Sequence, residues 1–468
     1  MTTSAAIPDA TEGSLPNSAT NACKLCTPLG ACLAFRGVAG AIPFLHGGQG
    51  CATYIRRYLI SHFREPMDIA ASNFSEASAV FGGGANLRAG LANVLRQYEP
   101  SMVGVATTCL SETIGEDVPG HLHEFAESQA QPATPIVPVS TPSYNGTHVD
   151  GFHSAVRAMV ESLAATGPVV EVSDGACSYP SPVAVFPGMV SPADLRELKR
   201  LASEVRIPMT LLPDYSETLD GPSWADYEKL PAGGTPIEAI RALGSASASI
   251  EFGRVLAGAA RTAGKSLESK HHVPLQRIGI PIGLRETDRF LEVLAALTGR
   301  PLPKALEAER GRLVDSWVDG HKYVFAKRAV VYGEEDFVVG MASFLCEIGI
   351  VPVLCASGGH SGRFETALRA AVPELGDTMV HEGSDFADIA AEAGVLEPDL
   401  LIGSSKGYGL AQQLGIPLVR CGFPIHDRIG GQRILHLGYA GAQALFDVIV
   451  NCLLDRKQAL SPIGYSYL

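Results

Sequence analysis

The sequence lacks the features that would place it in a membrane, in a secretory route or on nucleic acid. It has no stretch of about 18 uncharged apolar residues, so no membrane-spanning helix is predicted. The first 21 residues are small and polar, without the basic-then-apolar pattern of an export signal, and we expect residues 1–20 to form a flexible tail. Positive charge is in deficit, because 36 Lys and Arg residues face 49 Asp and Glu residues, giving a net charge of −13. This balance argues against a nucleic-acid partner.

Cysteine is too sparse for a fold stabilised by disulfides, with ten residues in a chain of 468. Together with the missing export signal, this number points to the reducing cytoplasm, where cysteines are thiols or metal ligands. The composition is 46% hydrophobic and 18% charged, so the chain can bury large cores and is not disordered. Its length allows about three domains of ~150 residues.

Short apolar runs alternate with amphipathic helical patterns from about Asn21 to the end of the chain. This alternation predicts parallel sheets covered by helices on both faces. We therefore expect an α/β fold of three doubly wound, Rossmann-like domains. Their predicted ranges are 21–165 for a cluster-binding domain, 166–275 for a second domain, and 276–468 for a third domain that ends in a helix.

Four local patterns give predictions that a structure can test. Ser191 followed by Pro192 predicts the N-cap and first residue of a helix that runs to residue 205. The stretch 245–265, rich in Ala and Ser, is helical in pattern. Residues 169–172 and 278–282 are predicted strands.

Three cysteines lie where an extended or irregular segment gives way to a helix: Cys26, Cys51 and Cys109. Thr27 and Pro28 are the predicted N-cap and first position of the first of these helices. A thiolate at a helix N-terminus sits in a favourable field, and thiolates are the ligands of iron–sulfur clusters. Three are too few for a closed four-ligand site, so we hypothesise a cluster shared with a partner chain. On spacing alone, the alternative of buried packing thiols stays open.

Several motifs together resemble the β-type subunit of nitrogenase component 1. The N-terminal motifs are Cys26-Thr-Pro-Leu-Gly-Ala, His46-Gly-Gly-Gln-Gly-Cys51, His62-Phe-Arg-Glu-Pro66, Phe81-Gly-Gly-Gly84, Thr107-Thr-Cys-Leu-Ser-Glu-Thr113 and Thr141-Pro-Ser-Tyr-Asn-Gly-Thr-His148. The later motifs are Phe186-Pro-Gly, Leu212-Pro-Asp214, Gly233-Gly-Thr235, Arg310-Gly-Arg-Leu-Val-Asp315, Gly422-Phe-Pro-Ile-His-Asp427 and Gly438-Tyr-Ala-Gly441. The resemblance spans the whole chain after the tail.

The resemblance implies an α2β2 heterotetramer with an α-type (D-like) subunit and an [8Fe-7S] P-type cluster at the α/β interface. It assigns Cys26, Cys51 and Cys109 as cluster ligands from this chain, and Ser143 as a serine that can bind iron when the cluster is oxidised. It places the catalytic iron–sulfur cofactor in the partner, so this chain has no catalytic residue of its own. An ATP-dependent iron protein (H-like) would dock and deliver electrons, with ATP bound only by that protein.

Within this superfamily, residues 52–61 and 72–76 look most like the K-type subunit of the nitrogenase-like methylthio-alkane reductase. That resemblance implies reductive cleavage of a carbon–sulfur bond, with release of methanethiol and a hydrocarbon. The alternatives are a cofactor-assembly scaffold subunit and a dinitrogenase β-subunit that reduces N2. The scaffold's β-like subunit usually keeps only the first of the three cysteines, so their retention favours a reductase.

Other chemistry-bearing residues have simpler interpretations. Cys23 forms a Cys-x-x-Cys pair with Cys26, but no second pair follows, so a non-ligand role is favoured. No Gly-Lys-Ser/Thr follows Gly82–Gly84, which excludes a P-loop and favours close packing of the backbone. The motif histidines, His46, His62 and His148, stay unassigned.

Overall fold

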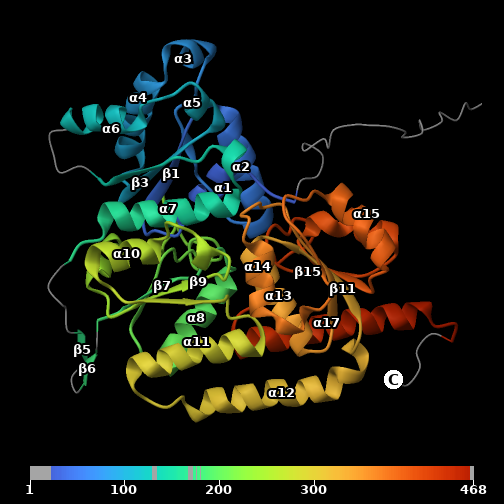
Figure 1. The fold of residues 1–468 in the computed structure, drawn as a ribbon. Coiled ribbons are helices and arrows are strands. Elements are labelled where there is room, and N and C mark those ends of the chain that lie inside the picture. Colours follow the sequence, from blue (N-terminus) through green and yellow to red (C-terminus); the bar gives the residue numbers. More distant parts are fainter. Residues whose placement is uncertain (1–22, 129–133, 167–171, 175–176, 180, 464–468) are drawn as a thin grey trace, which may run out of the picture.

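Three parallel sheets, each formed by one section of the chain, make up the framework of the molecule (Figure 1). The computed structural model describes residues 23–128, 134–166, 172–174, 177–179 and 181–463. The predicted tail lies outside these residues, as do residues 169–171 of one predicted strand. The three sheets confirm the predicted α/β class.

The first sheet has the strand order β2-β1-β3-β4 and carries the cysteine motifs. Its strands are β1 (Ala41–His46), β2 (Ala70–Ala71), β3 (Met102–Thr107) and β4 (Ile136–Val139). The central strands β1 and β3 are buried along their whole length, as expected for strands covered by helices on both faces. The covering and connecting helices are α1 (Thr27–Arg36), α2 (Gln49–Phe63), α3 (Glu76–Phe81), α4 (Gly84–Tyr98), α5 (Cys109–Thr113), α6 (Val118–Glu127) and α7 (His148–Leu163), with the short turn η1 (Ser143–Asn145).

The second sheet has the order β10-β9-β7-β8. Its strands are β7 (Val183–Phe186), β8 (Met209–Leu211), β9 (Ser249–Phe252) and β10 (Leu275–Ile278), and the main helices are α8 (Pro192–Glu204), α9 (Ile237–Arg241) and α10 (Ala263–His271). Val172 belongs to β5 (Val172–Asp174), which pairs antiparallel with β6 (Cys177–Tyr179) outside this sheet. Ser191 is the N-cap of α8, as predicted, and its side chain accepts a hydrogen bond from the Asp194 N–H.

Two sequence predictions for this region are wrong. Residues 245–265 do not form one helix, because Ser249–Phe252 is a fully buried strand between β7 and β10. Burial of Ile250 and Phe252 in the centre of a sheet outweighs the helical preference of the surrounding Ala and Ser residues. The strand predicted at 278–282 lies instead at Leu275–Ile278. These four residues pair with the four residues of β9, from Leu275 opposite Ser249 to Ile278 opposite Phe252. The predicted domain boundary between residues 275 and 276 falls inside this strand, and the division into domains stays a prediction.

The third sheet has the order β13-β12-β11-β14-β15, so the chain builds outward from β11 in both directions. Its strands are β11 (Arg328–Gly333), β12 (Val351–Ser357), β13 (Met379–His381), β14 (Leu400–Gly403) and β15 (Leu418–Arg420). Its helices are α11 (Gly283–Thr298), α12 (Lys304–Val324), α13 (Glu335–Glu347), α14 (Phe364–Ala371), α15 (Phe386–Leu396), α16 (Tyr408–Leu414) and α17 (Gly438–Leu460).

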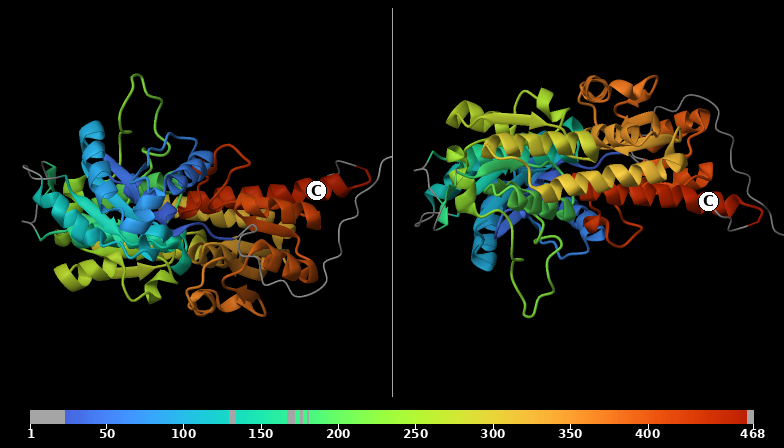
Figure 2. Two further views of the ribbon diagram at one scale, coloured as in Figure 1. Left: turned by 90° about the horizontal axis from the view of Figure 1, so that it is seen from above. Right: turned by 90° about the horizontal axis from the view of Figure 1, so that it is seen from below.

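Two long helices and one long loop shape the outside of the molecule. Helices α12 and α17 contact each other and run side by side (Figure 2). The chain between β8 and α9 projects from the body as a loop and exposes Trp224 and Tyr227 (Figure 2). No helix among the described residues is long and apolar enough to cross a membrane.

Candidate functional site

Each of the three predicted ligand cysteines lies at the start of a helix. Cys26 is the N-cap of α1, Cys51 is the third residue of α2, and Cys109 is the first residue of α5. The N-cap of α1 was predicted as Thr27, and this assignment is wrong by one residue. Cys26 has the extended backbone of an N-cap, while the Thr27 hydroxyl instead donates to the carbonyl of Pro142 at 3.4 Å.

Two of these helices follow neighbouring strands of the first sheet. His46 and Thr107 are register partners at the carboxyl ends of β1 and β3, which brings the segments leading to Cys51 and Cys109 together. Thr108 reinforces this contact, because its N–H and its hydroxyl each donate to the His46 carbonyl at 3.2 Å. Gly47 is required here, since a Cβ atom at this position would lie 2.0 Å from the Thr108 side chain.

The three thiols form one electrostatic group. Partial burial raises the pKa of the Cys51 thiol, and the neighbouring Cys26 and Cys109 thiols raise it further. Cys51 and Cys109 are exposed and Cys26 is half-buried, and all three are free of disulfides. Among the described residues, no three His, Cys, Asp or Glu side chains are arranged to hold a single metal ion. The thiols therefore share a surface without forming a mononuclear metal site.

Ser143 joins this group through two hydrogen bonds. Its N–H donates to the Cys109 Sγ atom at 3.2 Å, and its Oγ atom accepts from the Thr27 N–H at 3.2 Å. The serine thus connects the starts of α1 and α5, although it follows Cys109 by 34 residues. All four residues singled out in the sequence are brought together by the fold.

Large side chains around these four residues remain open to solvent. Tyr54, Leu110 and Tyr144 are 41%, 39% and 67% exposed, and each lies within three residues of Cys51, Cys109 or Ser143. The helix α3 ends in Val80 and Phe81, which are 74% and 88% exposed. Large apolar and aromatic side chains next to the thiols are therefore accessible.

The remaining cysteines and the glycine run have structural positions. Cys32 and Cys355 are fully buried, and burial raises the pKa of the Cys23 thiol to about 11. Close packing at the glycine run is confirmed, because a Cβ atom on Gly83 would lie 2.2 Å from the Phe74 ring and one on Gly84 would lie 2.4 Å from His121. The side chain of Cys177 lies outside the described residues.

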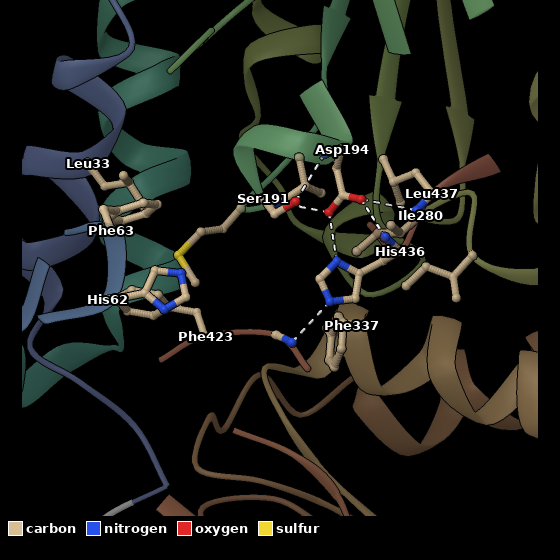
Figure 3. Close-up of a pocket in the computed structure, with 14 residues that line it drawn as sticks. Leu33, His62, Phe63, Ser191, Asp194, Ile280, Phe337, Phe423, His436 and Leu437 are labelled. Carbon is tan, nitrogen blue, oxygen red and sulfur yellow. Dashed lines mark hydrogen bonds and ion pairs between the residues drawn. The ribbon is translucent and has the colours of Figure 1, made fainter. Parts of the chain in front are cut away.

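A small buried cavity of about 30 Å³ lies where α8, α13 and the segment before α17 meet (Figure 3). Asp194 lines this cavity and accepts four hydrogen bonds. The donors are His436 Nδ1 (2.8 Å), the His436 N–H (2.6 Å), the Leu437 N–H (3.1 Å) and the Ser191 N–H (2.9 Å). Burial alone would raise the pKa of this carboxyl group, but the His436 ring and the hydrogen bonds outweigh it and hold the pKa below its usual value. His436 Nε2 accepts from the Gly422 N–H at 3.2 Å, while Nδ1 on the other side of the ring faces Asp194.

No local pattern in the sequence indicates this Asp–His pair, because 242 residues separate its members. The pair connects the second sheet's helix α8 to the third section of the chain. Its role is structural, since its hydrogen-bonding atoms are all occupied.

Comparisons with known proteins define the class to which this fold and its thiol surface belong. The family model "Nitrogenase component 1 type Oxidoreductase" matches residues 26–454, and the chain belongs to this family. Within it the chain is of the β-chain type: it is 36% identical over 439 residues to the nitrogenase molybdenum-iron protein beta chain of Clostridium pasteurianum, with 93% of each chain covered.

Further matches agree over nearly the whole length. The corresponding beta chain of Azotobacter vinelandii is 34% identical, and the match covers 93% of this chain and 84% of the relative. The solved structure described as "Nitrogenase Cp1 at pH 6.5" superposes with a TM-score of 0.90 at 34% identity, covering 99% of this chain and 98% of that one. The fold is thus that of a nitrogenase component 1 β-type subunit.

Proposed function

We propose that this chain is the β-type subunit of a nitrogenase-like reductase and supplies three thiolate ligands of an [8Fe-7S] P-type cluster that it shares with a partner chain. Cys26, Cys51 and Cys109 are the proposed thiolate ligands, and Ser143 is the proposed additional ligand of the oxidised cluster. The observation that carries the proposal is the convergence of three helix-start thiols on one accessible surface.

The residues present fit such a group chemically. Burial and the repulsion among neighbouring thiolates together raise the pKa of Cys51 in the chain alone, so the thiolate form needs a cationic partner. Iron stabilises thiolates at neutral pH, so binding a cationic centre would release their protons. The N–H of Ser143 already points a hydrogen bond at Cys109 Sγ, and hydrogen bonds to sulfur tune the potential of iron–sulfur centres.

The surroundings support a cluster shared between two chains. Three protein thiols leave a large cluster without a full ligand set, and the exposed Tyr54, Leu110 and Tyr144 would be buried by a partner that completes it. We propose that this partner is an α-type subunit in an α2β2 assembly and that it holds the catalytic iron–sulfur cofactor. An ATP-dependent iron protein would be the electron donor, with ATP bound by that protein only.

When bound, the cluster supplies one-electron transfer between the iron protein and the partner's cofactor. The chain's own residues hold it, exclude water around it and present the surface on which the partner docks. We propose reductive carbon–sulfur cleavage of small methylthio compounds as the net reaction. N2 reduction is the second candidate, because the similar proteins compared above are nitrogenase beta chains.

An activity assay of the complex separates these functions. We expect the chain, purified without air together with its α-type partner and iron protein, to release methanethiol and a hydrocarbon from a methylthio alcohol when ATP is supplied. Acetylene and N2 reduction should be measured on the same sample. N2 reduction without methanethiol release would identify a dinitrogenase, and iron binding without ATP-dependent turnover of any of these substrates would identify an assembly scaffold.

Ser143→Ala tests the redox-dependent ligand. We expect the variant to bind as much iron as wild type, because the backbone N–H that donates to Cys109 remains. Its oxidised cluster should show a changed electron paramagnetic resonance spectrum, while the reduced spectrum stays the same. Loss of the acceptor for the Thr27 N–H should cost about 1 kcal/mol of stability.

Ser140→Ala is the matched control, because this exposed serine lies on the same segment and its hydroxyl donates to Glu112 instead. An oxidised spectrum of Ser143→Ala identical to that of wild type would exclude the serine as a ligand.

A further inference from the structure

A series of buried and partly buried hydrogen bonds connects two glycine segments beside the thiol surface. At one end, the Gly47 N–H donates to Ser72 Oγ at 2.9 Å, and Ser72 Oγ lies 3.1 Å from His46 Nδ1. At the other end, the Gly83 N–H donates to Glu116 Oε1 at 2.5 Å, and Glu116 Oε2 lies 3.2 Å from His46 Nε2. His46 therefore joins the two halves.

The donors and acceptors in this series have one consistent order. The Glu116 carboxylate can only accept, so His46 Nε2 donates to it and His46 Nδ1 is left as an acceptor. The Ser72 hydroxyl then donates to Nδ1 while it accepts from the Gly47 N–H. His46 is fully buried, and the side chains of Ser72 and Glu116 are no more than 4% exposed, so water cannot replace a lost partner easily.

At its Gly47 end, this series of hydrogen bonds reaches the segments that lead to two of the thiols. Gly47 begins the turn that leads to Cys51, and the carbonyl of His46 is held by Thr108, the residue before Cys109. Gly83 lies two residues after Phe81, the exposed last residue of α3. Glu116 itself lies between α5, which starts at Cys109, and α6. A single carboxylate thus fixes the glycine segment 82–84 relative to the backbone on which two of the thiols depend.

We propose that Glu116 is a positioning residue, which holds the turn to Cys51 and the start of α5 in one arrangement through His46 and thereby sets the potential of the cluster. This inference rests on the proposed function, because it needs a cluster at the three thiols. The physical reason is that hydrogen bonding to sulfur and exposure of the cluster depend on where these two backbone segments lie.

Two substitutions separate geometry from charge. Glu116→Ala leaves the Gly83 N–H and His46 Nε2–H without an acceptor. Glu116→Gln removes the charge but can keep the series of hydrogen bonds: its oxygen accepts from Gly83 and its amide donates to His46 Nε2, while the ring proton moves to Nδ1. The Ser72 hydroxyl would then donate to the Gly47 carbonyl, which lies 3.4 Å away. Glu127→Gln, which neutralises an exposed carboxylate at the end of α6, is the control for the loss of one negative charge from this part of the chain.

The test is a redox titration of the anaerobically purified α2β2 complex, with iron counted in each sample. We expect Glu116→Ala to retain its iron and to show a shifted midpoint potential of the cluster, whereas Glu116→Gln and Glu127→Gln match wild type. An equal shift in Glu116→Gln and Glu116→Ala would show that charge acts and positioning does not. An unshifted potential in an iron-loaded Glu116→Ala complex would also overturn the proposal.

Ser72→Ala provides a second break in the same series of hydrogen bonds, for the case that Glu116→Ala does not assemble. We expect its potential to shift in the same direction as that of Glu116→Ala, and an unchanged potential in the iron-loaded complex would contradict the proposal. Hydrogen exchange of residues 47–51 gives a readout that needs no cluster. Exchange there should be faster in Glu116→Ala than in wild type, and equal rates would count against the link.

Failure of the proposed function would look different. If the purified wild-type complex held no iron, the proposed cluster and the proposed function would both be wrong. If the wild-type complex held iron but the Glu116 variants kept its midpoint potential, only the positioning role would be wrong.

Discussion

Replacing Cys51 with alanine is expected to remove most of the iron bound by the chain and its partner, and with it ATP-dependent reduction of any substrate. The Cys51 thiol is exposed and interacts with the other two cysteines, so its loss leaves only two of the three proposed thiolate ligands in this chain. Removing a residue that only hydrogen-bonds to a metal ligand lowers metal affinity or activity by roughly 10–100-fold. Removing a ligand itself should have a larger effect.

The fold should survive this change. Cys51 is the third residue of α2, and alanine is the best helix former, so α2 should still begin at Gln49. Cys452→Ala is the matched control, because this half-buried cysteine lies on α17, away from the thiol surface. Iron per αβ pair and the circular dichroism spectrum are the measurements. Equal iron content in Cys51→Ala and wild type would refute ligation by this residue.

Asp194→Ala is expected to cause a large loss of stability, although Asp194 lies outside the thiol surface. The change leaves four donors on Ser191, His436 and Leu437 without their acceptor in a buried site (Figure 3). Each buried donor that is left without an acceptor costs about 1–3 kcal/mol. We expect a lower midpoint in urea or thermal unfolding of the chain, with Asp226→Ala, on an exposed loop, behaving like wild type.

The pH dependence of this effect has a definite sign. Because the folded-state pKa of Asp194 is depressed, its contribution to stability is fully present above the ordinary carboxyl pKa and is lost as pH falls below it. The stability difference between wild type and Asp194→Ala should therefore be constant near neutral pH and shrink below about pH 4. A difference that grows on acidification would contradict the assignment of Asp194 as the charged member of the pair.

Local signals in the sequence were sufficient where the physics is local. The N-cap at Ser191 and the placement of each thiol at a helix start follow from capping residues and glycine turns. The signals failed at residues 245–265, where helix-favouring composition met a position in the centre of a sheet. The difference between the helix and strand propensities of these residues is smaller than the free energy gained by burying Ile250 and Phe252 in a strand between two neighbours.

His46 and Glu116 show what kind of functional residue a sequence hides. His46 lies in a recognisable motif, but its partners Ser72 and Glu116 are 26 and 70 residues away and belong to connecting segments. No spacing rule links such residues, since their proximity depends on how loops from several strands meet at one edge of the sheet.

The sequence by itself determined the class of fold, the three thiols and the local structure that presents each of them, because helix starts and buried strands are specified by neighbouring residues. Only the tertiary structure decided that the thiols and Ser143 share one surface, that Glu116 connects that surface to a glycine segment, and that Asp194 meets His436. These contacts join residues from 26 to 242 positions apart, and their geometry is set by strand register and by the packing of loops at sheet edges.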